Sequence, residues 1–205
     1  RSQTVTGVQT CALPICCFSE GERYLPVRLN MTTFILHGGA TSKDNKQNDY
    51  FFSCFSKFVS KSKVKILLCY FSREKSEQDK IIERDKPKII KNSSKRLSFQ
   101  IAKDAKDLLE KIEDCDVLYV AGGRPELLEP YYEQLEDLKE KLQDKVYIGS
   151  SMGAYMVSER YLTMQDDKVH KGMGLLPIQT ICHWDQKKDR EKKLALLKDN
   201  SDVMV

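Results

Sequence analysis

Short apolar runs alternate with amphipathic, charge-rich segments along most of the chain, and this alternation restricts the fold more than any other feature. Four of the runs have the character of buried strands, in residues 32–40, 63–72, 116–123 and 145–150. The segments between them, such as "AKDAKDLLEKIEDC", place leucine and isoleucine at helical spacing. Strands that alternate with helices favour a parallel sheet covered on both faces. We therefore predict an α/β fold of three layers, a mostly parallel sheet flanked by helices.

The remaining elements follow from the same patterns. Further helices are predicted over 48–60, 102–115, 124–144 (with a possible break at Pro130), 152–162 and 185–200, and the charged segment 73–95, which contains Pro87, is predicted as a helix and then a loop. Further strands are predicted over 96–101, 177–184 and 203–205, and a polar loop over 165–172. Glycine clusters end three of the four strong strands, and in open α/β sheets ligands bind beyond the carboxyl ends of the strands.

The first thirty residues differ from the rest. They do not begin with Met, show no periodicity, hold three of the seven cysteines and resemble a translated adapter sequence. We expect residues 1–30 to be a non-native, unstructured leader and residues 31–205 to form a single α/β domain. The final "VMV" has the character of a strand that has only begun, so we also expect this domain to be truncated at its C-terminus.

Composition narrows the range of partners. The net charge is only +4, and lysines and glutamates are interleaved along the expected helices, so nucleic acid is not expected as a partner. No apolar run approaches the ~20 residues that a membrane-spanning helix needs. The cysteines outside the leader are scattered without metal-ligand spacing, which is typical of a reducing cytoplasm. We expect no metal, no cofactor and no membrane partner, and a monomer or homodimer.

The stretch "VYIGSSMGAYMVS" carries the strongest chemical signal. It joins a strand to a helix through the pattern G-x-S-x-G, with Ser151 between Gly149 and Gly153. Such a turn holds a serine hydroxyl above the sheet as a nucleophile, and the glycines remove side chains that would clash. The N–H of Met152 then lies at a helix N-terminus, where negative charge is favoured. The alternative is that small residues only allow close packing of strand and helix.

A serine nucleophile needs a base, and the chain has three histidines. His37 ends the first strand and His170 lies in the polar loop. His183 follows "PIQTIC" at the carboxyl end of a predicted strand, so we expect it to share an edge with the serine. Asp166 or Asp167, in the loop between them, could orient the histidine, and the residues alone leave that choice open.

Three blocks together, "YIGSSMGAYMVS", "YVAGGRPELL" and "KGMGLLPIQTICHW", resemble the peptidase E (aspartyl dipeptidase) and cyanophycinase family of serine peptidases. The resemblance covers Met31 to the C-terminus. It implies a class I glutamine-amidotransferase-like, flavodoxin-like fold and a catalytic triad of Ser151, His183 and Asp166. It also implies an oxyanion hole formed by Gly123 and the N–H of Met152.

The same resemblance suggests substrate-binding residues. Arg190 is similar in place to an arginine that recognises acidic side chains in peptidase E, and Gly122 and Arg124 belong to the glycine-rich block. The family usually has alanine after the nucleophile, so the longer Met152 is expected to narrow the pocket. We expect a serine-type peptidase that cleaves a small peptide or amide through an acyl-enzyme on Ser151.

Two other functions are compatible with this fold. A glutamine amidotransferase normally has a cysteine nucleophile, and the serine at position 151 counts against that function. The second is a catalytically degenerate domain of the same fold that binds a ligand or partner. An intact arrangement of serine, histidine and carboxylate would separate a peptidase from such a binding domain.

Overall fold

A parallel sheet forms the centre of the computed structural model, which describes residues 8–10, 31–163, 165, 168–184, 190–197 and 202–204. Five parallel strands follow one another across the sheet in the order β2 (Thr33–His37), β6 (Val146–Ser150), β5 (Val117–Val120), β3 (Lys63–Cys69) and β4 (Arg96–Ile101). The predicted α/β fold is confirmed. A short strand, β1 (Val8–Thr10), pairs antiparallel with β2 at the edge. It is the described part of the expected leader; the remainder lies outside the described residues.

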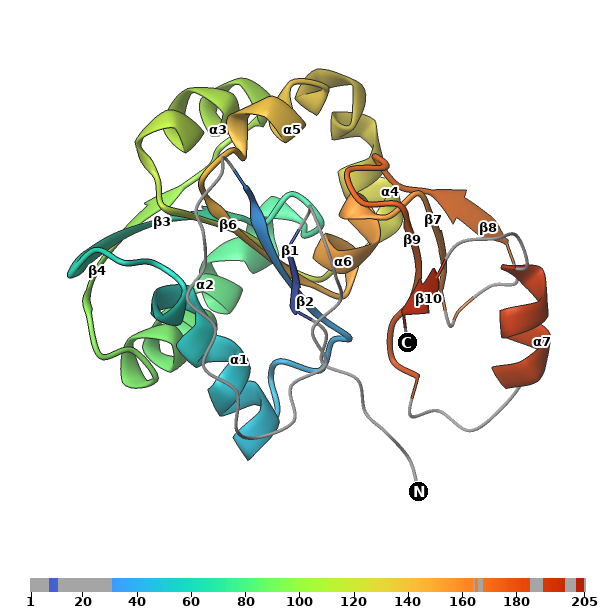
Figure 1. Ribbon diagram of the computed structural model, residues 1–205, viewed down its shortest axis with the longest axis horizontal. Coiled ribbons are helices and arrows are strands. Elements are labelled where there is room, and N and C mark those ends of the chain that lie inside the picture. Colours follow the sequence, from blue (N-terminus) through green and yellow to red (C-terminus); the bar gives the residue numbers. More distant parts are fainter. Residues whose placement is uncertain are drawn as a thin grey trace.

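Helices cover both faces of this sheet (Figure 1). On one face lie α1 (Lys46–Lys57) and α2 (Lys75–Lys91), and on the other lie α3 (Ala105–Lys111), α4 (Pro125–Leu128), α5 (Leu138–Lys141) and α6 (Met152–Val157). Successive strand residues alternate between the two cores, as in β2, where Phe34 packs with the α3–α6 layer and Ile35 with the α1–α2 layer. In β5 and β6 every residue is buried, so these two central strands contain no charged side chain, whereas the edge strand β4 alternates exposed and half-buried residues.

Proline has different effects in two of the predicted helices. The segment 124–144 is divided into α4, two 3-10 turns (Glu129–Tyr131 and Glu133–Leu135) and α5, with Pro130 in the first turn. In contrast, α2 continues past Pro87 to Lys91. A third 3-10 turn, Ile112–Asp114, extends α3.

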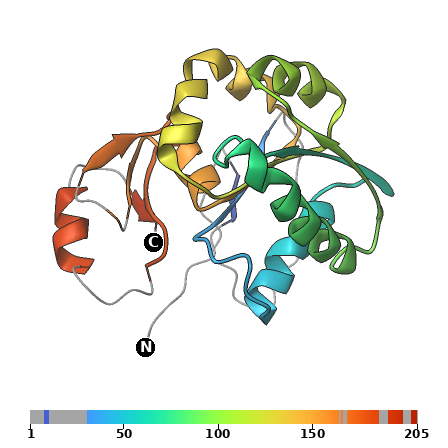
Figure 2. The ribbon, with the colours of Figure 1, turned by 180° about the vertical axis from the view of Figure 1, so that it is seen from behind.

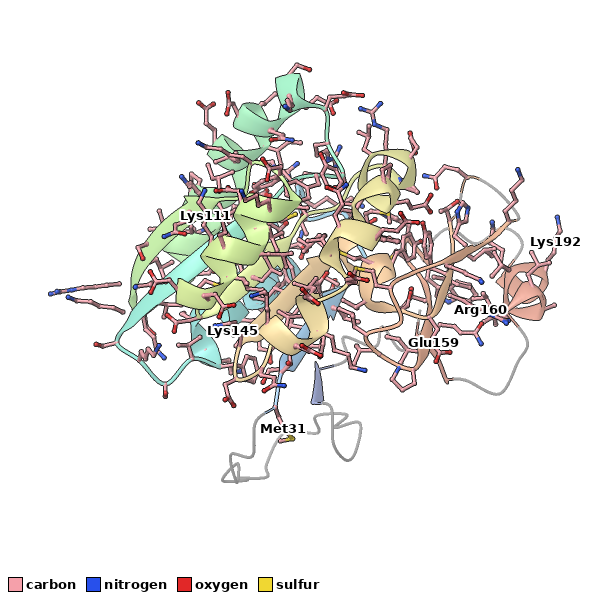
Figure 3. All side chains as sticks on the ribbon, turned by 90° about the horizontal axis from the view of Figure 1, so that it is seen from above. Met31, Lys111, Lys145, Glu159, Arg160 and Lys192 are labelled. Carbon is pink, nitrogen blue, oxygen red and sulfur yellow. The ribbon has the colours of Figure 1, made fainter. Side chains whose placement is uncertain are left out.

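A second, smaller sheet lies beyond α6, at the side of the large sheet (Figures 1 and 2). Its strands are ordered β10 (Asp202–Met204), β9 (Ile178–Ile181), β7 (Arg160–Leu162) and β8 (Val169–Lys171), and α7 (Arg190–Leu196) accompanies it. Figure 3 shows Glu159, Arg160 and Lys192 on this part of the molecule, and Lys111 and Lys145 on the part that contains the large sheet.

The second sheet corrects two sequence predictions. The helix predicted over 152–162 ends at Val157, and the polar loop predicted over 165–172 contains β8. The side chain of Ser158 donates a hydrogen bond to the carbonyl of Tyr155 (2.7 Å), which helps to end α6. β7 then pairs with β9. These strands have only three or four residues each, so their pairing depends on contacts that are distant in sequence.

Within the described residues, no helix has the length and apolar content needed to cross a membrane.

Candidate active site

Ser151 lies in a sharp turn between β6 and α6. Its backbone angles are φ 49° and ψ −103°, in a region that residues with a side chain rarely occupy. The Ser151 N–H donates to the carbonyl of His37 at the end of β2 (2.8 Å), so the neighbouring strand holds the turn in place. Strain of this kind is characteristic of a nucleophile elbow, where it projects the hydroxyl from the sheet edge.

The glycines on either side of Ser151 are required by close contacts. A Cβ atom on Gly149 would lie 2.5 Å from the carbonyl oxygen of Gly153, and one on Gly153 would overlap the carbonyl oxygen of Val120. Both obstacles are backbone atoms, which cannot move aside as a flexible side chain could. The pattern G-x-S-x-G therefore reflects a tight crossing of β6, α6 and β5 beneath the serine.

His183 reaches the serine from the second sheet. Its Nε2 atom lies 3.1 Å from Ser151 Oγ, at hydrogen-bonding distance. The residue follows the end of β9 and also has a positive φ, 59°. Its N–H donates to the carbonyl of Gly38 (2.9 Å) in the loop that follows β2. The serine and the histidine are thus 32 positions apart in the chain, and the contact between the two sheets brings them together.

Tyr155 connects the elbow helix to the segment that carries the histidine. Its buried hydroxyl donates to the carbonyl of Leu162 (3.0 Å) and accepts the N–H of Cys182 (2.9 Å). Cys182 immediately precedes His183. The Tyr155 hydroxyl therefore fixes the distance between α6 and the small sheet, by one bond to β7 and one to the residue that follows β9.

A cavity of about 170 Å³ opens in front of the serine. It is lined by the loop after β2, the ends of β3, β5 and β6, one residue of α2, and the histidine: Gly39, Ala40, Thr41, Ser42, Arg73, Arg84, Ala121, Gly122, Gly123, Ser150, Ser151 and His183. These strand ends meet at one edge because the strands are parallel, as expected for an α/β sheet.

Two arginines give this cavity a positive wall. Arg84, from α2, binds the fully buried carboxylate of Asp85, with Nε at 2.8 Å and an NH2 group at 2.7 Å from Oδ1. The hydroxyls of Tyr70 and Tyr119 donate to the other carboxylate oxygen (3.3 and 3.4 Å). Burial raises the pKa of Asp85, and the Arg84 charge and the hydrogen bonds oppose that shift. The buried Asp85 carboxylate thus orients the Arg84 guanidinium at the wall of the cavity.

Two other titratable groups near the serine remain uncharged. Burial lowers the pKa of His37, a hydrogen bond with Asn48 opposes this, and the nearby His183 lowers it further. The Nδ1 atom of His37 accepts the N–H of Gly39 (3.1 Å), so this ring supports the loop after β2. Burial raises the pKa of the Cys182 thiol to about 12. Cys182 is therefore protonated at neutral pH and unsuited to act as a nucleophile.

Backbone donors are available beside the serine. Met152 is the first residue of α6, so its N–H has no acceptor within the helix. Gly123 lines the cavity. In the described part of the chain, no residue accepts a hydrogen bond from its N–H. The expectation that the Met152 side chain narrows the pocket is wrong: it is 1% exposed and packs in the core of the α3–α6 layer.

The structure separates some predicted site residues from the cavity. Arg124 is outside the lining and pairs with Glu74 (3.1 Å) and Glu77 (3.5 Å) across the loop. Arg190 begins α7, and nothing is described of its side chain. His170 stacks on Tyr161 in the small sheet. Asp166 and Asp167, the alternatives for the third triad member, lie outside the described residues.

Sequence reasoning missed Arg73, Arg84 and the loop over 39–42 as parts of the site. A signal existed for Arg73, because it follows the carboxyl end of a strong strand, where α/β proteins place their ligands. No such signal marked Arg84, one of many charged residues in a helix with several lysines and glutamates. Only the packing of α2 against the sheet brings it to the cavity.

Comparisons with known proteins agree with this architecture. The family model "Peptidase family S51" matches residues 34–204. Two solved structures share the fold at 14% identity. A peptidase from an acI-B1 Actinobacterium has a TM-score of 0.55 over 82% of this chain and 75% of its own. A candidate peptidase E protein from Listeria monocytogenes EGD-e has a TM-score of 0.51 over 80% and 85%.

No match was found among curated proteins. At such low identity, the two structural neighbours show only that the fold is shared. The family match carries more weight because it extends from β2 to β10 and includes both the elbow serine and the histidine that contacts it. The chain belongs to peptidase family S51.

Proposed function

We propose that this chain is a serine-type peptidase that cleaves a small peptide or amide through an acyl-enzyme on Ser151. The observation that carries the proposal is the 3.1 Å contact between Ser151 Oγ and His183 Nε2 at the wall of a cavity. Membership of peptidase family S51 supports a peptidase in general. The strained elbow and the contact with the imidazole support a serine as the attacking group.

The reaction follows from the roles these atoms can take. Ser151 Oγ bonds to the substrate carbonyl carbon while His183 Nε2 accepts the hydroxyl proton. The N–H groups of Gly123 and Met152 donate to the oxyanion that forms. The carbon–nitrogen bond then breaks, and the imidazolium returns the proton to the leaving amine. Water enters by the same steps and releases the acid. We assign the orientation of the imidazole to Asp166.

The cavity favours a small, negatively charged substrate. A cavity of about 170 Å³ beside the serine accommodates a small side chain. The guanidinium groups of Arg73 and Arg84 line it, and arginine binds carboxylates well because of its planar array of donors. A dipeptide with an acidic residue on the acyl side of the bond combines small size with this charge. Arg190 remains a further candidate for recognition of that side chain.

The decisive experiment compares two adjacent serines. Ser151→Ala should abolish hydrolysis of acidic dipeptides and labelling by a fluorophosphonate probe, because both reactions need the Oγ nucleophile. Ser150→Ala, which removes the neighbouring hydroxyl at the same strand end, should keep both. Thermal unfolding of each variant checks that the fold is preserved. Labelling of Ser151→Ala at the rate of the parent would exclude Ser151 and leave the ligand-binding function ahead.

A second experiment identifies the carboxylate. Activity, as kcat/KM, should rise with pH through the neutral range, because His183 must lose its proton to act as a base. Asp166→Asn should lower the rate and move the inflection to lower pH, since the imidazolium loses a charged partner. Asp167→Asn is the matched control and should do little. The reverse pattern would show that Asp167 is the third member of the triad.

A further inference from the structure

Arg73 contacts the loop that we assign to the oxyanion hole. It follows the end of β3 and lines the same cavity as Ser151. Its Nε atom donates a hydrogen bond to the carbonyl oxygen of Gly122, at 2.6 Å. A guanidinium is a charged donor, and hydrogen bonds from charged groups are stronger than those between neutral ones. Arg73 therefore holds one particular peptide group beside the nucleophile.

That peptide group determines the direction of the Gly123 N–H. The carbonyl of Gly122 and the N–H of Gly123 belong to the same peptide unit, which is trans, because the described backbone has no cis peptide bond. In a trans unit the C=O and N–H bonds point in opposite directions. The bond that draws the carbonyl toward Arg73 therefore turns the Gly123 N–H away from Arg73. With glycine on both sides, side chains do little to oppose rotation of this unit.

The peptide units on either side are held by the preceding residue. Ser72 Oγ donates to the carbonyl of Ala121 (2.9 Å), and the carbonyl of Ser72 accepts the N–H of Arg124 (2.9 Å). Three successive peptide units, from Ala121 to Arg124, thus each have one hydrogen bond to the pair Ser72–Arg73. Of the three bonds, only the one from Arg73 fixes the unit that contains the Gly123 N–H.

We propose that Arg73 is a positioning residue, which orients the Gly123 N–H toward the oxyanion and polarises it. The inference rests on the proposed function, because it assumes an oxyanion at this place. A cation bound to the carbonyl of a peptide unit makes its N–H a better donor, since hydrogen bonds in a chain strengthen one another. Arg73 acts through the peptide and does not itself need to touch the reacting atoms.

Two substitutions at one atom position test this role. Glutamine places an amide nitrogen, and methionine a methyl group, where Arg73 has Nε. We expect Arg73→Met to lower kcat and the fluorophosphonate labelling rate of Ser151 by about 10- to 100-fold, somewhat less than loss of an oxyanion-hole donor. Arg73→Gln should recover most of both, although it has no charge. A purely structural role would change stability and would not separate these two variants.

Two further variants separate position from charge. Arg73→Lys keeps the charge but has no nitrogen at the Nε position, so its kcat should fall as in Arg73→Met. If Arg73→Met does not fold, Arg73→Lys still tests whether Arg73 positions the Gly123 N–H. Arg84→Met removes the other cavity arginine and should raise KM for acidic dipeptides with a smaller effect on labelling by the uncharged probe.

The outcomes distinguish this inference from the function on which it rests. If Arg73→Met and Arg73→Lys keep the kcat and labelling rate of the parent while Ser151→Ala loses both, the positioning role is wrong and the peptidase stands. Equal kcat for Arg73→Lys and the parent would show that charge alone matters and would also overturn it. If the parent neither hydrolyses acidic dipeptides nor reacts with the probe, the proposed function fails and the inference fails with it.

Discussion

The two sheets contribute differently to the site. The large sheet supplies Ser151 and Arg73 from strand ends that lie at one edge because the strands are parallel, and helix α2, which covers the sheet, supplies Arg84. The small sheet supplies His183, from a strand of four residues whose neighbours have three. Two extensive apolar cores cover the faces of the large sheet, and one of them continues into the small sheet through Tyr161, Ile178 and Cys182. The outer side of the small sheet has only a cluster of Leu162, Ile181 and Leu197 with two partly buried neighbours.

Ser151 and His183, the proposed nucleophile and base, therefore have different structural support. The position of Ser151 is fixed locally, by backbone contacts within the large sheet. The position of His183 depends on how the small sheet sits against the large one, through bonds such as those of Tyr155. We therefore expect substitutions at the junction to affect catalysis more than stability. Substitutions at the junction and away from it can therefore separate the two kinds of support.

Gly39→Ala should have the largest effect on activity. Gly39 has φ 107°, and a Cβ atom there would overlap the imidazole of His183. Displacing a catalytic group by about 1 Å can cost on the order of 10²-fold in rate, and we expect a loss of that size in kcat/KM. The matched control is Gly38→Ala, whose Cβ would have His183 N at 3.9 Å, an ordinary contact. Full activity in Gly39→Ala would contradict the position of the imidazole.

Tyr155→Phe should have an intermediate effect on both properties. Removing the hydroxyl leaves the Leu162 carbonyl and the Cys182 N–H without this buried partner, which costs about 1–3 kcal/mol of unfolding free energy. Because Cys182 precedes His183, kcat should fall as well. Tyr119→Phe, which removes a buried hydroxyl within the large sheet, should lower stability with less change in kcat. Urea unfolding and steady-state kinetics on both variants measure the contrast; equal losses of kcat would remove the special role of the junction.

His37 should give the smallest effect, seen only in the pH dependence of stability. Burial lowers its pKa below 6.5 in the folded protein, so the unfolded chain takes up a proton first as the pH falls. The stabilisation from the neutral ring is complete about one unit above pH 6.5 and decreases as the pH falls through 6.5 toward the lower pKa of the folded state, by up to about 1.4 kcal/mol per pH unit.

The variant His37→Asn keeps an acceptor for the Gly39 N–H but cannot titrate. Its unfolding free energy should therefore fall less between about pH 7.5 and about pH 5.5 than that of the parent. The same slope in both proteins would mean that His37 becomes protonated as easily in the folded state as in the unfolded chain.

Much of the large sheet could be predicted from the sequence. Residues 66–69 and 117–120 are buried on both faces, and such stretches must be apolar throughout, which distinguishes them from amphipathic helices. The tight turn around Ser151 could also be predicted from the sequence, because its glycines are required by backbone contacts that any chain with this turn must make. Local patterns suffice where the physical requirement is local.

The small sheet was harder to predict. Residues 160–162 were predicted as helix and 169–171 as loop, although they form β7 and β8. Three residues show no clear period, and their strand conformation comes from pairing with each other and of β7 with β9. Arg84 could not be assigned to the cavity for a similar reason, since its helical segment is rich in charge throughout.

The α/β class, the serine in its tight turn and the histidine as its expected partner could be inferred from the sequence, because apolar periodicity and tight turns depend on neighbouring residues. Features that depend on distant segments became visible only in the folded chain. The tertiary structure brought Ser151 Oγ and His183 Nε2 to 3.1 Å across two sheets, and it placed Arg73 and Arg84 at the cavity and Arg124 outside it. Charge, unlike apolar periodicity, does not show in the sequence which way a side chain will face, and only packing fixes that direction.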